Sequence, residues 1–210
     1  MKRIIKFLFY ILFIYVLFNI FLTLTVPIKY EEEIDKTVEK TGINKALLLA
    51  LIKQESNFKF DAVSNKGALG LTQLMPTTID YVTEKFSVET KISDIFIPEK
   101  NIYLGAIYLK DLIERFKSEK LALIAYNAGP SNLKKWLDEG IINENLSVEN
   151  IPFEETKKYV QNIEKLKKRY ELLLKTPYRV PEKMQDYILK FKNQGFGSIK
   201  SIKKWLEDLI

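Results

Sequence analysis

The pattern of apolar and polar positions begins with one long stretch that carries no charge. Residues 7–28 read FLFYILFIYVLFNIFLTLTVPI. As a helix rising about 1.5 Å per residue, this stretch would be about 33 Å long, enough to cross a hydrocarbon core of about 30 Å. Three basic residues, Lys2, Arg3 and Lys6, precede it, and basic flanks stay on the cytoplasmic side. The pattern predicts one membrane-spanning anchor, with the chain from Lys29 onward outside the cytoplasm.

A cleaved signal peptide is the alternative interpretation of the same segment. Signal peptides have a shorter apolar core and end at a small-x-small cleavage site. The exit of this segment reads TLTVPIKYEEE, which offers no good pair of alanine-like residues, and the chain has no cysteine to carry a lipoprotein anchor. The length of the apolar stretch favours an uncleaved anchor.

Beyond the anchor and a short charged segment, 30–39, apolar residues recur at helical spacing, and no segment shows sustained strand-type alternation. Asn44 is a predicted N-cap, and Pro76 fits the first turn of a helix. The predicted fold class is mainly α. Helices are predicted at 45–54, 77–86, 101–116, 121–126 and 154–174, with one further turn at 133–137 and a loop at 141–153.

Two prolines, Pro177 and Pro181, mark the start of a C-terminal segment. Two short amphipathic patterns follow them, separated by Gly-Phe-Gly at 195–197, and predict a helical hairpin appended to the main domain. Simple packing of this hairpin onto the core is favoured over a dedicated binding module. The expected domains are 1–28, 29–176 and 177–210.

Composition excludes several kinds of chemistry. The chain has neither cysteine nor histidine, which removes disulfides, thiolate nucleophiles, histidine-containing triads and the commonest zinc ligands. Acid–base chemistry near neutral pH must therefore use carboxylates, lysine or tyrosine. The net charge of +6 falls to +3 once the three basic residues before the anchor are set aside. This weak excess permits attraction to anionic envelope polymers or membrane surfaces and gives no support for a nucleic-acid partner.

Glu55 is the candidate catalytic residue. It follows the very apolar segment 46–52, and helical steps back from it reach Ile52, Leu51 and Leu48. Desolvation on such a face raises the pKa of a carboxyl group. A carboxyl protonated near neutral pH can protonate a glycosidic oxygen, as the acid of lysozyme does. Most glutamates at helix ends point into solvent, so Glu55 alone does not establish a site.

The loop that follows Glu55 strengthens the case for a cleft. Gly67 and Gly70 allow the backbone to approach a substrate or another segment closely. Gln73 supplies amide donors and acceptors, and Met75 supplies an adaptable apolar wall. Each residue has an ordinary structural explanation by itself, and their joint spacing after the glutamate indicates a binding cleft.

Four ordered motifs carry a resemblance to a known family. They are Glu-Ser at 55–56, Gly-Ala-x-Gly-Leu-x-Gln-x-Met-Pro at 67–76, Ala-Tyr-Asn-Ala-Gly at 125–129 and Glu-Thr-x-x-Tyr-Val at 155–160. In this order they resemble the soluble lytic transglycosylases, whose SLT catalytic domain has a lysozyme-like α fold. The resemblance covers about residues 31–174, so the segment beyond Pro177 lies outside it.

The resemblance implies roles for individual residues. Glu55 would be the catalytic acid/base, with Ser56 beside it supporting the site. Tyr126 would hydrogen-bond near the glutamate or the substrate, whereas Glu155 would brace the site and Tyr159 would pack. The implied sugar-binding cleft contains Ser56, Gln73, Met75, Tyr126 and Asn127, shaped by Gly67 and Gly70.

The resemblance also implies an activity, that of a peptidoglycan lytic transglycosylase anchored in the bacterial cell membrane with an extracytoplasmic catalytic domain. A retaining glycosidase needs a second carboxyl about 5 Å from the first. No spacing singles one out among the available acids, Asp61, Asp80, Asp94 and Glu155. In the family one glutamate serves both steps, and the substrate's own N-acetyl group stabilises the sugar cation before the C6 hydroxyl closes a 1,6-anhydro ring.

The expected partners are peptidoglycan glycan strands and the membrane, and no metal or cofactor is required. Two alternatives remain. One is a hydrolase of goose-lysozyme type, which would release a reducing sugar. The other is a non-catalytic peptidoglycan-binding module, against which the presence of Glu55 argues.

Overall fold

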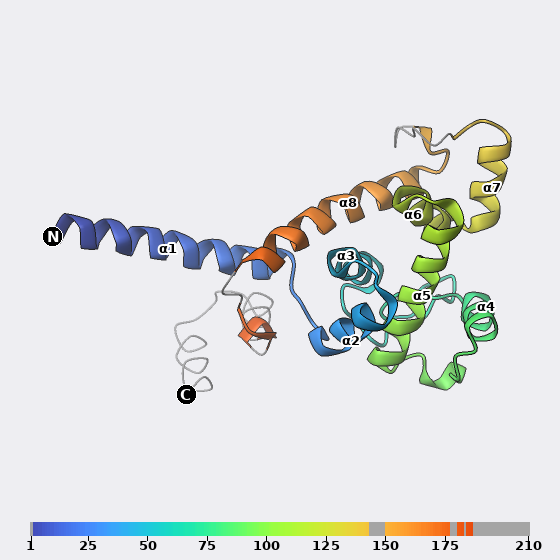
Figure 1. The fold of residues 1–210 in the computed structure, drawn as a ribbon, viewed down its shortest axis with the longest axis horizontal. Coiled ribbons are helices and arrows are strands. Elements are labelled where there is room, and N and C mark those ends of the chain that lie inside the picture. The colour runs from blue at the N-terminus through green and yellow to red at the C-terminus, as the bar shows by residue number, and fades with distance from the viewer. Residues whose placement is uncertain (1, 143–149, 177–179, 183, 187–210) are drawn as a thin grey trace. The chain divides into compact units, whose positions relative to one another are not determined.

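The computed structural model describes residues 2–142, 150–176, 180–182 and 184–186, and over these residues the chain is mainly α, as predicted (Figure 1). Its only extended pairings there are two isolated bridges, Val63–Leu69 and Leu69–Leu74. The elements are α1 (Lys2–Thr25), α2 (Glu31–Thr41), α3 (Lys45–Ser56), α4 (Pro76–Phe86), the 3-10 turn η1 (Ile92–Asp94), α5 (Pro98–Phe116), α6 (Glu119–Ala128), α7 (Pro130–Asp138) and α8 (Glu154–Lys175).

Contacts divide the chain into two compact units. One unit is Tyr30–Lys175, and the other contains Met1–Lys29 together with Thr176–Ile210. The predicted hairpin falls mostly at 187–210, outside the described residues. The domain limits expected from the sequence therefore stay a prediction.

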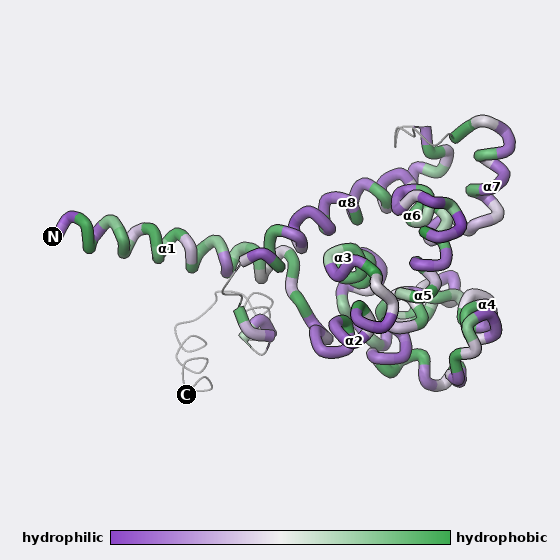
Figure 2. Tube along the Cα trace, viewed as in Figure 1, coloured by the Kyte–Doolittle hydropathy of each residue, from purple (hydrophilic) through white to green (hydrophobic). Residues whose placement is uncertain are grey.

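Helix α1 is apolar over almost its whole length, and most of its side chains are exposed (Figure 2). Its segment Lys2–Leu22 contains an 18-residue window with a mean hydropathy of 2.3, and only 6% of that window is buried. Within the described part of the chain, it is the one helix whose length and composition suit a membrane span. A soluble helix with this many exposed phenylalanine, isoleucine and leucine side chains would be exceptional.

Helix α3 forms the centre of the unit Tyr30–Lys175. Asn44 caps it as predicted, since its Oδ1 accepts a hydrogen bond from the backbone N–H of Leu47 at 3.0 Å. All residues from Ala46 to Ile52 are buried, which is why this segment shows no polar face. The helix runs two residues further than the predicted 45–54, and Glu55 therefore lies in its last turn.

Helix α8 packs against α3, and α5 contacts both α2 and α6 (Figure 1). The amphipathic pattern predicted for α8 is confirmed, because Tyr159, Ile163, Tyr170 and Leu173 are all buried. The charged segment 30–39 forms most of α2, whose apolar side faces the core through Ile34.

Helices α5, α6 and α7 begin earlier than the apolar pattern predicts. Pro98 and Pro130 occupy first-turn positions, where a missing N–H has no consequence. Ser118 caps α6 by accepting from the N–H of Leu121 at 3.3 Å. The extra first turns consist mostly of polar residues and proline. The spacing of apolar residues therefore does not predict them.

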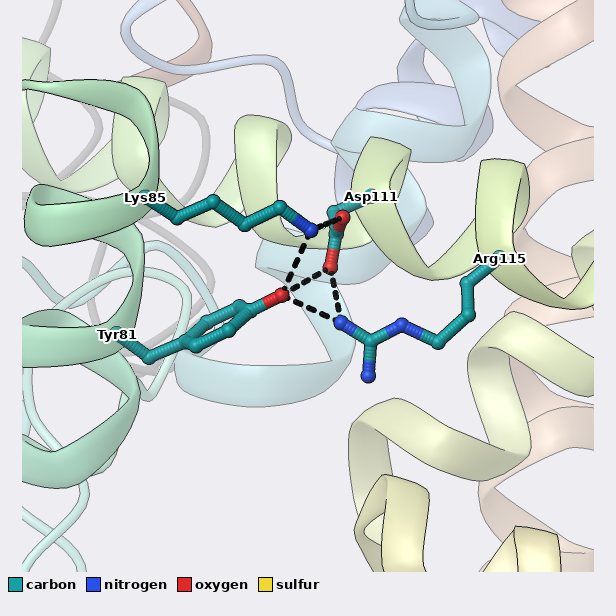
Figure 3. A network of polar contacts seen from close by, with 4 residues as sticks. All are labelled: Tyr81, Lys85, Asp111 and Arg115. Carbon is teal, nitrogen blue, oxygen red and sulfur yellow. Dashed lines mark hydrogen bonds and ion pairs between the residues drawn. The ribbon is translucent and has the colours of Figure 1, made fainter.

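A polar cluster joins α4 to α5 (Figure 3). Asp111 accepts from Lys85 at 2.5 Å, from Arg115 at 2.7 Å and from the hydroxyl of Tyr81 at 2.9 Å. Burial raises the pKa of Asp111, but the hydrogen bonds from Lys85 and Tyr81 and the charge of Arg115 outweigh it and leave that pKa lowered. The cluster holds α4 on the core, and α4 begins at the cleft described next.

Candidate active site

Glu55 faces a cleft with a volume of about 370 Å³. Its carboxyl hydrogen-bonds to Tyr159, Tyr126 lines the same cleft, and the residue is partly exposed. Burial raises the pKa of Glu55 to about 7, against a smaller lowering effect from a hydrogen bond with Tyr159. The carboxyl can therefore both donate and accept a proton near neutral pH.

Tyr159 is the hydrogen-bond partner of Glu55. Its hydroxyl, from the second turn of α8, donates to Oε1 of Glu55 at 2.5 Å. Burial raises the pKa of Tyr159 well above its ordinary value, and the charge of Glu55 adds to this. The phenol thus stays protonated and acts as a donor. The expectation that Tyr159 only packs is therefore incomplete, because the side chain also holds the candidate acid.

Tyr126 lines the cleft, but its hydroxyl has a different partner. It donates to the backbone carbonyl of Thr72 at 2.8 Å. Burial raises the pKa of Tyr126 well above its ordinary value, and the nearby charge of Glu55 raises it further. The phenol that bonds the glutamate is that of Tyr159, and Tyr126 instead ties α6 to the loop that follows α3.

Gln73 and Met75, two residues expected in the sugar-binding cleft, both line this hollow. The amide nitrogen of Gln73 donates to the carbonyls of Ala62 at 3.1 Å and Gly70 at 2.8 Å, which holds the side chain in place. Met75 is 39% exposed and ends the loop directly before α4. Gly67 has a φ of 84° with open space around it, which makes it a turn residue at the rim.

The buried pair Thr72 and Asn101 holds the same loop from behind. The Oδ1 atom of Asn101 accepts from the Thr72 backbone N–H at 2.8 Å and from the Thr72 hydroxyl at 2.7 Å. The Nδ2 atom of Asn101 donates to the carbonyl of Leu69 at 3.1 Å. Two glycines make room for this arrangement: a Cβ on Gly70 would lie 2.1 Å from Nδ2 of Asn101, and one on Gly105 would lie 2.4 Å from Oγ1 of Thr72.

Neither Asn101 nor Gly105 was singled out from the sequence. Asn101 lies in the first turns of α5, where a polar residue is expected to face solvent, and its partner is 29 residues away. The one available signal is a glycine inside an apolar helical pattern, since such a glycine usually has a packing reason.

Asn127 and Glu155 connect the cleft to a second hollow of about 300 Å³, to which Glu55, Lys158, Tyr159 and Asn162 also contribute. Asn127 is held in place because its Oδ1 accepts from the hydroxyl of Thr156 at 2.7 Å. The side chain of Glu155 is 74% exposed and lies 3.7 Å from the amine of Lys66 across the rim. Glu55 thus lies where the two hollows meet.

Ser56 does not line either hollow. It is buried, and its hydroxyl donates to the carbonyl of Ile52 at 3.2 Å. Its contribution in this structure is to the end of α3 next to Glu55.

A second carboxyl beside Glu55 is hard to find among the described residues. Of the four acids that the sequence offers, Asp61, Asp80 and Asp94 line neither hollow, and Asp94 pairs with Lys100 at 2.6 Å. Glu155 is at the rim. Within the same residues, no group of three or more acidic side chains is placed to hold a metal ion.

The sequence of this chain is similar to those of known proteins. Residues 32–143 match the family described as "Transglycosylase SLT domain". The chain is 32% identical over 157 residues to a putative soluble lytic murein transglycosylase of Haemophilus influenzae, covering 73% of this chain and 26% of that protein. It is 30% identical over 168 residues to membrane-bound lytic murein transglycosylase C of Edwardsiella ictaluri, covering 68% of this chain and 46% of that protein.

The fold of this chain is also similar to solved structures. The 70 kDa soluble lytic transglycosylase of Escherichia coli aligns with a TM-score of 0.66 at 30% identity, over 76% of this chain and 26% of that one. An inactive mutant of the lytic transglycosylase Slt from Pseudomonas aeruginosa aligns with a TM-score of 0.65 at 32% identity, over 73% of this chain and 25% of that one. The chain thus spans about a quarter of the length of these soluble relatives.

Proposed function

This chain belongs to the transglycosylase SLT domain family, and we propose that it is a membrane-anchored peptidoglycan lytic transglycosylase. It cleaves the β-1,4 bond between N-acetylmuramic acid and N-acetylglucosamine in the glycan strand. The names of the relatives, soluble and membrane-bound lytic murein transglycosylases, support this activity. The observation that carries the proposal is the carboxyl of Glu55, which has a pKa of about 7 and lies where the two hollows of the cleft meet.

In the first step, protonated Glu55 donates its proton to the glycosidic oxygen as the bond to C1 of the muramic acid breaks. Burial keeps enough of the carboxyl protonated near neutral pH for this transfer. The substrate's own N-acetyl group stabilises the cation at C1, so no carboxylate nucleophile is needed. This fits the position of Glu155 at the exposed rim, paired with Lys66.

In the second step, ionised Glu55 takes the proton of the C6 hydroxyl while O6 forms a bond to C1. The proton count balances, because Glu55 returns to its protonated form and the product contains no added water. The hydrogen bond from Tyr159 stabilises Glu55 in the ionised state between the two steps. The C6 hydroxyl belongs to the same sugar, and proximity favours it over water as the attacking group.

Mass spectrometry of products from purified peptidoglycan tests this reaction. The full-length protein in detergent should release muropeptides that end in 1,6-anhydro-N-acetylmuramic acid, lighter by one water than lysozyme products. Reducing ends would instead identify a hydrolase of goose-lysozyme type. No product from the wild type, with glycan binding retained, would identify a binding module.

The membrane part of the proposal rests on α1, with the unit Tyr30–Lys175 on the extracytoplasmic side. The full-length protein should sediment with membranes, and external protease should reach residues beyond Lys29 in spheroplasts. Recovery of a soluble form that starts near residues 27–32 would show cleavage and remove the anchor from the proposal.

A further inference from the structure

The segment after Lys175 contacts the end of the apolar helix. The side-chain oxygen Oε1 of Gln185 accepts a hydrogen bond from the backbone N–H of Ile28 at 2.8 Å. The same side chain donates through Nε2 to the carbonyl of Val180 at 2.8 Å, and the Gln185 backbone N–H donates to Pro181 at 2.9 Å. Gln185 is only 5% exposed. Both nitrogens and the side-chain oxygen of this residue are therefore engaged.

The chain leaving α1 needs such an acceptor. The backbone N–H of Val26 still bonds to Leu22 at 2.7 Å, and Pro27 has no N–H. Ile28 therefore carries the next backbone donor, and it is only 1% exposed. A buried N–H without an acceptor is strongly unfavourable, and Gln185 provides that acceptor from a position 157 residues away.

An ion pair lies next to this hydrogen bond. The amine of Lys29 is 2.5 Å from the carboxylate of Asp186, with the two side chains 31% and 56% exposed. An exposed pair adds little stability by itself. The ion pair instead helps to fix the register of the two segments. Two consecutive residues at 28–29 contact two consecutive residues at 185–186.

We propose that residues 180–182 and 184–186 form a docking segment that attaches the catalytic unit to the membrane anchor a second time. Tyr30–Lys175 is joined to the anchor through Lys29 at its first residue. The docking segment adds an attachment behind its last residue. A unit connected to the anchor at both ends has less rotational freedom than one connected at a single end.

Cysteine cross-linking of the full-length protein in nanodiscs tests the docking directly, because the chain has no cysteine of its own. The variant Lys29→Cys/Asp186→Cys should form an intramolecular disulfide under mild oxidation, visible as a shift in gel mobility that reductant reverses. Lys29→Cys/Glu84→Cys, with the second cysteine at an exposed position of α4, measures random encounter. Equal yields in the two variants would overturn the proposal.

Hydrogen exchange at the Ile28 amide gives a second measurement. Gln185→Ala removes the acceptor, and exchange at Ile28 should become at least about tenfold faster. Gln185→Glu keeps an acceptor oxygen and should protect the amide more than alanine does. Unchanged exchange in Gln185→Ala would mean that the contact does not form in the membrane-bound protein.

The second attachment itself is tested by the motion of the catalytic unit. A dye on Glu84→Cys should show slower anisotropy decay in the otherwise wild-type protein than in the Gln185→Ala/Asp186→Ala background. Equal decay would leave the unit held at one end only. The inference relies on α1 as the anchor of the proposed function but not on catalysis, and these three measurements remain informative if the proposed reaction proves wrong.

Discussion

The hydroxyl of Tyr159 donates a hydrogen bond to Oε1 of Glu55, joining the start of α8 to the end of α3 across 104 residues of sequence. This contact acts on the pKa of Glu55 in the direction opposite to burial. Burial alone would favour a carboxyl that holds its proton and gives it up poorly as an acid. A donor aimed at the ionised form makes the first proton transfer, from Glu55 to the glycosidic oxygen, easier, and the balance near pH 7 suits a residue that must act as acid and then as base.

Glu55→Gln should bind glycan and lose nearly all turnover. Glutamine keeps the size of the side chain and can still accept from Tyr159, but it has no titratable proton. General acid–base assistance is typically worth about 10²–10⁴-fold, and kcat measured by anhydro-muropeptide release should fall by at least that factor. Glu155→Gln makes the same chemical change at the exposed rim of the cleft and should retain kcat within about tenfold. Equal losses in both variants would contradict the single-carboxylate mechanism.

The pH dependence should report the titration of Glu55. Because the acid step needs the protonated carboxyl, and the pKa of Glu55 is about 7, kcat should decline as the pH rises through this value. The hydrogen bond from Tyr159 lowers this pKa, so Tyr159→Phe should move the declining limb to higher pH. A hydrogen bond worth about 0.5–1.5 kcal/mol corresponds to a shift of about 0.4–1.1 pH units.

Tyr126→Phe is the matched control for that shift. It removes the same atom from a tyrosine of the same cleft, but the hydroxyl concerned bonds to Thr72 instead of Glu55. The declining limb should stay in place while the loop is loosened. A shift of equal size in Tyr126→Phe would mean that the two phenols act through general polarity instead of through the contact with Glu55.

Glu55 should also make the folded protein less stable at alkaline pH. Its folded-state pKa of about 7 lies above the ordinary value of 4.5, so the folded state binds more protons than the unfolded state between these pH values. The free energy of unfolding therefore decreases as the pH rises from about 4.5 to 7. Relative to wild type, Glu55→Gln should gain about 1–3 kcal/mol in that free energy at pH 8 compared with pH 4. Denaturant unfolding at the two pH values measures this, and a pH-independent difference would show that the pKa of Glu55 is not raised.

Local patterns in the sequence were sufficient to predict much of the fold. Asn44 as an N-cap, Pro76 in the first turn of α4 and the buried stripe of α8 each follow from residues within a few positions of one another. The desolvation that raises the pKa of Glu55 follows in the same way, from helical steps of three and four residues. These features depend on neighbours along the chain, which is why sequence inspection finds them.

Contacts between distant segments could not be predicted by these means. Asn101 has no local feature that separates it from a solvent-facing residue, yet its side chain organises the loop around Thr72. The hydroxyl of Tyr159 belongs to a stripe that already has a packing explanation. The contact of Gln185 with Ile28 joins two segments that lie outside the family resemblance. In each case the sequence supplies the residue, and only the folded chain supplies its partner.

The close approach of α5 to the cleft loop makes Gly105→Ala a sharp test of the scaffold. In an ordinary helix interior, replacing glycine by alanine is stabilising by about 1 kcal/mol. Here the new Cβ would lie 2.4 Å from Oγ1 and 2.5 Å from Cβ of Thr72, which is buried and bonded to Asn101. The collision should instead destabilise the fold by about 1–3 kcal/mol. It should also lower kcat/KM, because the Thr72 carbonyl that accepts from Tyr126 must move.

A double-mutant cycle separates this collision from other effects of the substitution. Thr72→Gly removes all three side-chain atoms that the new methyl group would meet, although it also removes the hydroxyl bond to Asn101. The free energies of unfolding from denaturant titration should show that Thr72→Gly/Gly105→Ala is less destabilised than the sum of the single variants, since the collision is absent from the double variant. If the losses in the free energy of unfolding are additive, the destabilisation by Gly105→Ala does not come from the collision with Thr72. A stabilised Gly105→Ala would mean that the loop is not held against α5 at Thr72, and the cleft wall would then need another support.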